Sequence, residues 1–136
     1  MKTAIDSSVL YCIGKREPGY EAWQRALAVA AAEGILVVCP VVFAEISPGR
    51  STAARVSADL AALDIHYDPI SPEAAFLAGQ IHLAYRLEGG PRERLIPDFI
   101  IAAHAQVQAG RLAVVDRGYL RRYFPALTLL QPLKGN

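Results

Sequence analysis

The sequence predicts an α/β protein whose sheet is mainly parallel. Short apolar runs alternate along the chain with longer stretches in which apolar residues recur every three or four positions. The short runs are apolar on successive residues rather than on alternate ones, which is typical of strands covered on both faces of a parallel sheet. With 136 residues, 53% of them hydrophobic, residues 1–136 are expected to form one domain with right-handed crossovers between the strands.

Five segments are expected to be strands because each is a short apolar run bounded by turn residues or charges. The first has the weakest pattern, and the third would be an edge strand. These segments are residues 3–5, 35–39, 65–67, 112–115 and 127–130.

Amphipathic helices are expected between the strands. The predicted buried stripes are Trp23, Leu27 and Ala30 in one helix, Val56, Leu60 and Leu63 in a second, and Leu77, Ile81 and Ala84 in a third. The third has clear end signals, since Ser71 is a suitable N-cap, Pro72 suits the first helical position, and Gly89-Gly90 would stop it. Two further helices are expected over residues 40–46 and 97–110.

Charge and hydropathy exclude several classes of protein. Fourteen Lys and Arg stand against thirteen Asp and Glu, so the net charge of +1 favours neither an acidic nor a basic partner. The longest uncharged stretches have twelve residues, short of the roughly 20 that span a bilayer, and no secretory signal is recognisable. We therefore expect a cytoplasmic protein without a membrane segment, in which Cys12 and Cys39 are reduced and packed.

The motifs of the common nucleotide-binding and hydrolase folds do not occur in the sequence. No G-x-G-x-x-G follows the first predicted strand, and there is no P-loop motif. Ser7 and Ser8 follow an apolar strand, but they are not part of a G-x-S-x-G elbow. A dinucleotide site and serine hydrolase chemistry are therefore not supported.

Four acidic residues stand out by their positions on the predicted elements. Asp6 and Asp116 directly follow two predicted strands, so both are expected at the carboxyl edge of the sheet, where ligands bind in open α/β folds. Glu45 lies in a short helix just beyond another strand and is expected on the same rim. Asp98 lies in the first turn of a helix, but periodicity alone does not determine which edge that turn occupies.

A cation is the simplest way to bring several carboxylates together, because like charges at short distance repel one another. Hard oxygen ligands suit Mg²⁺ or Mn²⁺, and such an ion can bind phosphate oxygens and activate water for phosphodiester hydrolysis. Each acid alone also has a structural explanation, since aspartates cap helices and glutamates cover helix surfaces. The prediction of metal-dependent phosphodiester hydrolysis therefore depends on the set of four.

Basic and aromatic residues surround two of these acids in the sequence. Arg117, Arg121 and Arg122 are interleaved with Tyr119, Tyr123 and Phe124, and Arg92 and Arg94 precede Asp98. Such groups suit phosphate contact and base stacking. In the alternative interpretation, Leu120 and Phe124 belong to the core and the arginines form a solvated face. His104, six positions after Asp98, faces away from it and is expected to be structural.

Four segments that contain the acids together span nearly the whole chain. They are IDSSVLYCI around Asp6, CPVVFAEI around Glu45, LIPDFIIAAHAQV around Asp98 and VVDRGYLRRYFP around Asp116. In this order they resemble the PIN-domain ribonucleases, and more closely the VapC-type toxins of type II toxin–antitoxin systems.

The resemblance implies a PIN-like three-layer α/β/α fold with a five-stranded parallel sheet. It also implies an endoribonuclease that cleaves RNA phosphodiester bonds by metal-activated water, forms a homodimer and is inhibited by a small VapB-like antitoxin. Mg²⁺ or Mn²⁺ would be the cofactor, bound directly or through water by Asp6, Glu45 and Asp98, while Asp116 would complete the pocket or hold a second, weaker ion. The expected RNA-binding residues are Ser8, Arg94, Arg117, Arg121 and Arg122.

Two departures from the family pattern keep alternatives open. Ser8 stands where many relatives have Asn, and Val114 stands where a Ser or Thr is common. Because Val114 has no hydroxyl group, a catalytically weak or inactive PIN-fold module that binds RNA or a protein is the main alternative. A DNA-directed nuclease also remains open, since metal-dependent hydrolysis does not itself select the sugar. A phosphotransfer receiver is disfavoured, because Asp6 stands alone and the one late lysine, Lys134, lies in the tail.

Overall fold

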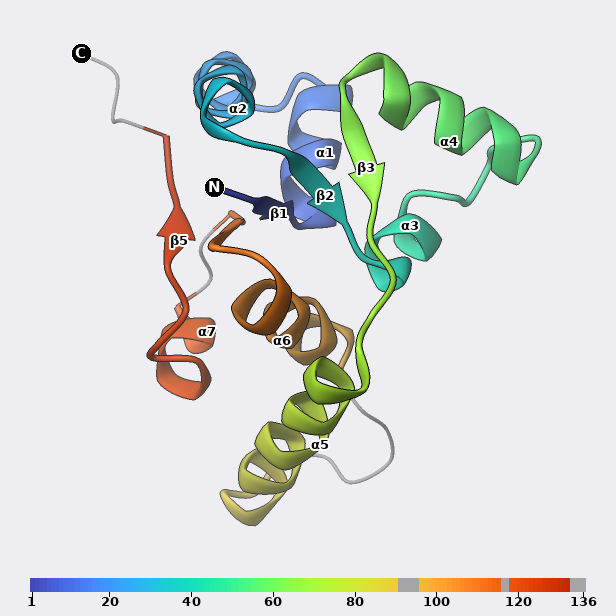
Figure 1. Cartoon of the computed structure of the whole chain (residues 1–136). Coiled ribbons are helices and arrows are strands. Elements are labelled where there is room, and N and C mark those ends of the chain that lie inside the picture. Colours follow the sequence, from blue (N-terminus) through green and yellow to red (C-terminus); the bar gives the residue numbers. More distant parts are fainter. Residues whose placement is uncertain (91–95, 116–117, 133–136) are drawn as a thin grey trace.

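The computed structural model describes residues 1–90, 96–115 and 118–132 of the chain. These residues form five strands and seven helices (Figure 1). The strands are β1 (Thr3–Ile5), β2 (Leu36–Val38), β3 (Ile65–Tyr67), β4 (Arg111–Ala113) and β5 (Leu129–Leu130). The helices are α1 (Ser7–Gly14), α2 (Tyr20–Glu33), α3 (Pro40–Glu45), α4 (Ala53–Ala62), α5 (Pro72–Leu87), α6 (Pro97–Gln108) and α7 (Tyr119–Tyr123).

The sheet has the strand order β3-β2-β1-β4-β5, and every neighbouring pair is parallel. The five-stranded parallel sheet is therefore confirmed. In the centre, Thr3 of β1 lies beside Leu36 of β2 and Arg111 of β4. The chain moves outward from β1 to β3 and then crosses back to β4 on the other side of β1. The carboxyl ends of β1 and β4 thus flank the topological switch point, where open α/β sheets bind ligands.

Helices cover both faces of this sheet. α1, α2 and α4 line one groove together with β2 and β3, so these three helices share a face. α6 packs on β1 and β4, and α5 packs on α6, away from α1 and α2 (Figure 1). The strands between the layers are buried, and Ile5, Val38 and Leu112 are at most 1% exposed. The α/β/α layering implied by the resemblance is therefore present.

The predicted buried stripe is confirmed for α2 and partly wrong for α4. The buried residues of α2 are Trp23, Leu27 and Ala30, and those of α4 are Val56 and Leu60. Leu63 is 60% exposed, because α4 ends at Ala62 and Leu63 is its C-cap. The periodic spacing alone did not show that the helix stops before this residue.

The predicted stripe of α5 is partly wrong: Leu77 and Ile81 do pack against the core, but the fully buried face of the helix is rotated away from them. Its buried residues are Ala74, Ala78 and His82, whereas Ala84 is exposed and both Leu77 and Ile81 are partly buried. This side of α5 packs on α6. The small side chains of Ala74 and Ala78 let the two helix backbones approach closely, whereas the periodic spacing predicts large side chains at the centre of this contact.

Helix α1 is not among the helices expected from the sequence. Asp6 is its N-cap, and the carboxylate Oδ2 accepts a hydrogen bond of 3.0 Å from the backbone N–H of Ser8. Val9 and Cys12, three positions apart, are its buried residues. A capping aspartate followed by apolar residues at this spacing is a helix signal, so the sequence did contain the information.

Both cysteines are free and buried, as expected. Burial raises the pKa of the Cys12 and Cys39 thiols, so both favour the neutral form. Among the helices of the described residues, none has the length and apolar character needed to cross a bilayer.

A hydrogen-bonded network ties the end of α6 to the loop between β3 and α5. Nε2 of His104 lies 2.8 Å from Oδ2 of Asp68, and the side-chain amide of Gln108 donates to the same oxygen and to the carbonyl oxygen of Pro69. His104 is 1% exposed, which confirms its structural role. Burial lowers the pKa of His104, and this effect outweighs the hydrogen bond and charge of Asp68, which act in the opposite direction.

This network predicts that the fold loses stability in mildly acidic solution. An unfolded chain protonates histidine below about pH 6.5, whereas folded His104 stays neutral to lower pH, so the unfolded state binds more protons there. Between about pH 7.5 and about pH 5.5, the urea midpoint of the wild type should drop by more than that of His104→Gln, whose amide can still donate to Asp68. Equal drops in the two proteins would exclude His104 as the source.

Candidate functional site

Asp6 lies at the carboxyl end of the central strand β1. Its backbone N–H donates to the carbonyl oxygen of Ala113 on β4 at 2.9 Å, which places it beside the switch point of the sheet. Asp6 is 7% exposed, and its carboxylate also accepts the hydrogen bond from Ser8 that caps α1. The same side chain therefore begins a helix and faces the ligand-binding edge.

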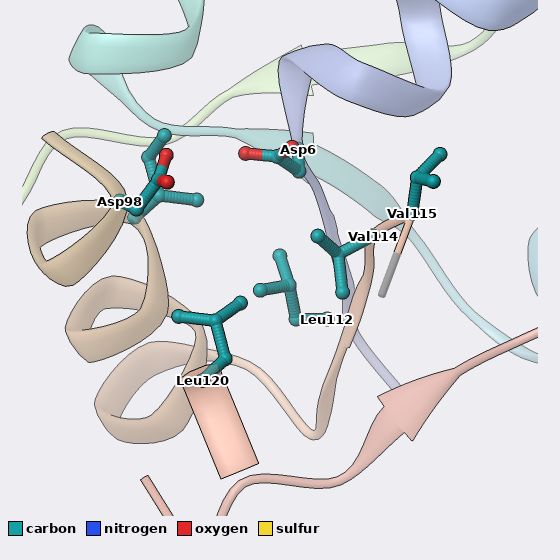
Figure 2. Close-up of a pocket in the computed structure, with 7 residues that line it drawn as sticks. Asp6, Asp98, Leu112, Val114, Val115 and Leu120 are labelled. Atoms are coloured by element: carbon teal, nitrogen blue, oxygen red, sulfur yellow. The ribbon is translucent and has the colours of Figure 1, made fainter. Parts of the chain in front are cut away.

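Asp98 lies on this same edge, a point that periodicity had left open. It belongs to the first turn of α6, and the positive end of the helix dipole favours a charged carboxylate there. Asp6 and Asp98 line one small hollow. Figure 2 shows both carboxylates turned toward the space between them.

The hollow between the two acids is narrow and mostly apolar. Its volume is about 10 Å³, which is room for about one water molecule. The other lining residues are Ile101, Leu112, Val114, Val115 and Leu120. No basic side chain is among the described residues of this wall. Two carboxylates in such surroundings repel each other and attract a cation, because little solvent screens them.

Glu45 is held next to the hollow without lining it. It is the last residue of α3, and its Oε1 accepts a hydrogen bond of 2.9 Å from the hydroxyl of Ser7. The hydroxyl of Tyr11, one turn further along α1, donates to the backbone carbonyl of Glu45. Because Ser7 directly follows Asp6, these contacts fix Glu45 beside the first acid. This role of Ser7 was not predicted from the sequence pattern.

The fourth predicted acid cannot be placed with the others. Asp116, Arg117 and Arg94 lie outside the described residues. Within residues 1–90, 96–115 and 118–132, no group of three or more histidine, cysteine, aspartate or glutamate side chains is placed to hold a metal ion. The structure thus brings together Asp6 and Asp98, and the complete set of four acids stays a prediction.

Ser8 and Val114 connect the start of α1 to the end of β4. The Ser8 hydroxyl accepts a hydrogen bond of 3.1 Å from the backbone N–H of Val115. Val114 is 4% exposed and lines the hollow near Asp6 (Figure 2). Ser8, predicted to bind substrate, therefore also holds the segment that leads to Asp116.

Helix α7 carries two of the predicted RNA-binding arginines on its exposed side. Leu120 and Phe124 are buried, as the alternative interpretation of this segment held. Arg122 Nη2 donates to Glu88 Oε2 at 2.9 Å, and both side chains are largely exposed. Because Leu120 also lines the hollow, Arg121 and Arg122 follow directly after a residue of its wall.

A comparison with known families decides the relationship of the chain. The model of the PIN domain matches residues 3–125. The chain belongs to the PIN-domain family. No curated protein matches it.

Three solved structures that resemble this PIN domain are of VapBC and VapC proteins. VapBC2 from Rickettsia felis, bound to a promoter DNA fragment, includes a chain with 18% identity and a TM-score of 0.70, over 95% of this chain and 97% of that one. DNA-bound VapBC from Salmonella typhimurium includes a chain with 22% identity and a TM-score of 0.63, over 95% of this chain and 96% of that one. Mycobacterium tuberculosis VapC20, a Sarcin–Ricin loop cleaving toxin, has 13% identity and a TM-score of 0.59, over 96% of this chain and 99% of that one. At these identities the likeness shows the fold.

The Ser7–Glu45 hydrogen bond should stabilise this PIN domain measurably. Ser7→Ala removes the donor to a part-buried carboxylate, so the free energy of unfolding should fall by about 0.5–1.5 kcal/mol, whereas Ser7→Thr keeps the hydroxyl and should lose less. Urea unfolding measures both values. The matched control is Ser57→Ala at an exposed position of α4. An unchanged free energy for Ser7→Ala would show that this contact does not hold Glu45.

Proposed function

We propose that this PIN domain is a divalent-metal-dependent endoribonuclease and the toxin of a type II toxin–antitoxin system of the VapBC kind. The observation that carries the proposal is the pair Asp6 and Asp98, which face one hollow at the switch point of a PIN fold. VapC20, a protein of similar fold, is described as a toxin that cleaves the Sarcin–Ricin loop, which supports RNA as the substrate. We further propose that residues 1–136 form a single domain that acts in the cytoplasm.

The residues of the hollow fit Mg²⁺ or Mn²⁺. Mg²⁺ in nucleotide enzymes is commonly held by one or two carboxylates, with water and substrate phosphates completing its shell. Asp6 and Asp98 supply two such hard oxygen ligands, and we assign Glu45 and Asp116 to the same ion, directly or through water. When bound, the ion would lower the pKa of a water ligand and neutralise charge on the phosphate.

The chain's own residues would place and desolvate the RNA phosphate. The apolar wall of Leu112, Val114 and Leu120 limits water in the hollow, and this strengthens every charge interaction there. Arg121 and Arg122, exposed on α7, would contact backbone phosphates, together with Arg94 and Arg117. To reach RNA, Arg122 would have to leave or share its contact with Glu88.

A PIN-fold module that binds RNA or a protein without cutting it is the second candidate. The buried position of Val114 favours it, because an apolar side chain lines the hollow where relatives commonly carry a hydroxyl. The two candidates differ in one measurable property, which is RNA cleavage that depends on Mg²⁺ or Mn²⁺.

The large groove beside α1 is our candidate surface for a VapB-like antitoxin. Its volume is about 620 Å³, and α1, α2 and α4 supply most of its apolar lining. Lys15 and the ion pair of Arg50 with Asp59 are the charged groups of this groove. Tyr11 lines it and also contacts Glu45, so an apolar segment seated there would lie beside the acids. The VapBC structures of similar fold support a partner of this kind.

Replacing either acid of the hollow should abolish cleavage without unfolding the protein. Asp6→Asn and Asp98→Asn remove a negative charge but keep the size, and Asn can still cap α1. Cleavage of total cellular RNA in Mg²⁺ or Mn²⁺ should fall about 100-fold or more, and EDTA should have the same effect on the wild type. Glu21→Gln, at an exposed acid of α2, is the control. RNA binding by the wild type with no metal-dependent cleavage would favour the binding module instead. Cleavage of a DNA of matched sequence, measured beside the RNA, shows whether the enzyme selects for ribose.

Antitoxin binding should depend on the large groove. Leu63 lines it and is 60% exposed, so Leu63→Glu changes the groove without opening the core. When the chain is co-expressed with the product of a short reading frame next to its gene, this variant should weaken capture by about tenfold or more. Val29→Glu, an equally exposed apolar position of α2 that does not line the groove, is the control. Equal capture by both variants would contradict the assignment.

A further inference from the structure

The ring of Tyr67 is exposed at the end of an edge strand. Tyr67 is the last residue of β3 and is 52% exposed, more than any other tyrosine whose side chain the structure describes. Its hydroxyl makes no hydrogen bond within the described part of the chain. Single exposed aromatic residues are common on protein surfaces, so the position of this ring has to show whether it has a use.

The ring lies on the same edge of the sheet as the two acids of the hollow. Tyr67 is the register partner of Val38 on β2. The residue before it, Val37, is the register partner of Ala4 on β1, so Tyr67 lies one residue before the level of Asp6. Because only β2 separates β3 from β1, the lateral distance between these two strands is about 10 Å. Tyr67 and the hollow are therefore neighbours on the carboxyl edge.

Helix α3 joins this tyrosine to the acidic residues, and Figure 1 shows α3 beside the end of β3. The rings of Phe43 and Tyr67 meet edge to face, with centroids 5.4 Å apart and planes inclined by 82°. Phe43 packs against the core, and two residues later Glu45 accepts the hydrogen bond from Ser7. In an edge-to-face pair each ring covers at most one face of the other. At least one face of Tyr67 therefore stays clear of Phe43.

The backbone that carries the ring is held in place on both sides. Tyr67 itself pairs with β2, and the N–H of Asp68 donates to the carbonyl oxygen of Val38 at 2.8 Å. The carboxylate of Asp68 is in turn held by His104 and Gln108. An aromatic ring on a fixed backbone loses little conformational freedom when a ligand binds, so its contact contributes more to the affinity.

A flat ring at this distance suits the base of a nucleotide near the phosphate at the hollow. Successive phosphates of a stacked strand are roughly 3.4 Å apart, so about 10 Å corresponds to roughly three nucleotides. Unpaired RNA is commonly bound by stacking its bases on aromatic side chains, and every base has a face that can stack. Tyr67 is not among the residues that line the large groove, so an apolar segment seated there would not need it.

We propose that Tyr67, supported by Phe43, stacks on an unpaired base of the RNA a few nucleotides from the phosphate at Asp6 and Asp98. The stacking contact rests on the proposed function, because the two acids define where the RNA lies. Stacking depends little on which base is present, so this contact selects for an unpaired nucleotide at one position rather than for one sequence.

Binding of an unpaired RNA oligonucleotide to protein that does not cleave it tests the contact. In the Asp98→Asn background, Tyr67→Leu keeps an apolar side chain against Phe43 but removes the flat ring, so the dissociation constant should rise about fivefold or more. Tyr67→Phe keeps the ring and should restore binding to within about twofold. Phe76→Leu makes the same kind of change on α5, at a position 69% exposed, and should have no effect. Circular dichroism and urea midpoints should show that all three variants are folded.

A fluorescent adenine analogue, moved along the oligonucleotide, locates the stacked base because its emission falls when it stacks. Emission should fall at one position with Tyr67 and recover in Tyr67→Leu. An abasic nucleotide at that position should raise the dissociation constant as much as Tyr67→Leu does. The two changes together should cost little more than either alone, since both remove the same contact. Full additivity of the two losses overturns the stacking.

The outcomes separate this contact from the proposed function. Metal-dependent cleavage by the wild type, together with unchanged RNA binding by Tyr67→Leu, overturns the stacking and leaves the nuclease. RNA binding that depends on Tyr67, without cleavage, supports the stacking and favours the binding module. If the wild type neither binds nor cuts unpaired RNA, both are wrong. If Tyr67→Leu keeps RNA binding but loses the product of the neighbouring short reading frame, the ring contacts that partner and the stacking is wrong.

Discussion

The parallel pairing of β1 with β4 is the constraint on which the rest of the structure depends. It joins residues 3–5 to residues 111–113, and the backbone N–H of Asp6 extends it to Ala113. The chain reverses its direction of travel across the sheet at this pair of strands. Without this pairing, Asp6 at the end of β1 and Asp98 on α6, the helix that leads into β4, would not be brought to the same edge of the sheet. The Ser8–Val115 hydrogen bond adds a side-chain contact at the same place.

The site that results is governed by charge in apolar surroundings. Asp6 is almost completely buried, and Asp98 faces the same hollow from the first turn of α6. The N-termini of α1 and α6 both favour negative charge, so the fold tolerates two nearby carboxylates before any cation is present. Local structure and the chemistry of the site therefore use the same side chains. The capping hydrogen bond is accepted by Oδ2 of Asp6, and a carboxylate can accept at both oxygens, so capping and the proposed metal binding do not exclude each other.

The two layers of helices leave different surfaces for partners. On one face, α1, α2 and α4 enclose a wide apolar groove that reaches the neighbourhood of Glu45. On the other, α5 presents a narrow stripe of exposed apolar residues at the far side of α6. A groove of this kind suits an inserted apolar segment.

The sequence by itself determined the parallel α/β architecture, the approximate strands and the position of Asp6 directly after a strand, because runs of apolar residues and capping signals are local properties. Helix α1 was overlooked although its capping signal at Asp6 is local. The sequence did not reveal the rotation of α5, since this depends on where the helix meets its neighbour. The approach of Asp98 to Asp6 was likewise decided only by the tertiary structure. Ninety-two positions separate the two acids in sequence, and only the packing of α6 on β1 and β4 brings both carboxylates to one hollow.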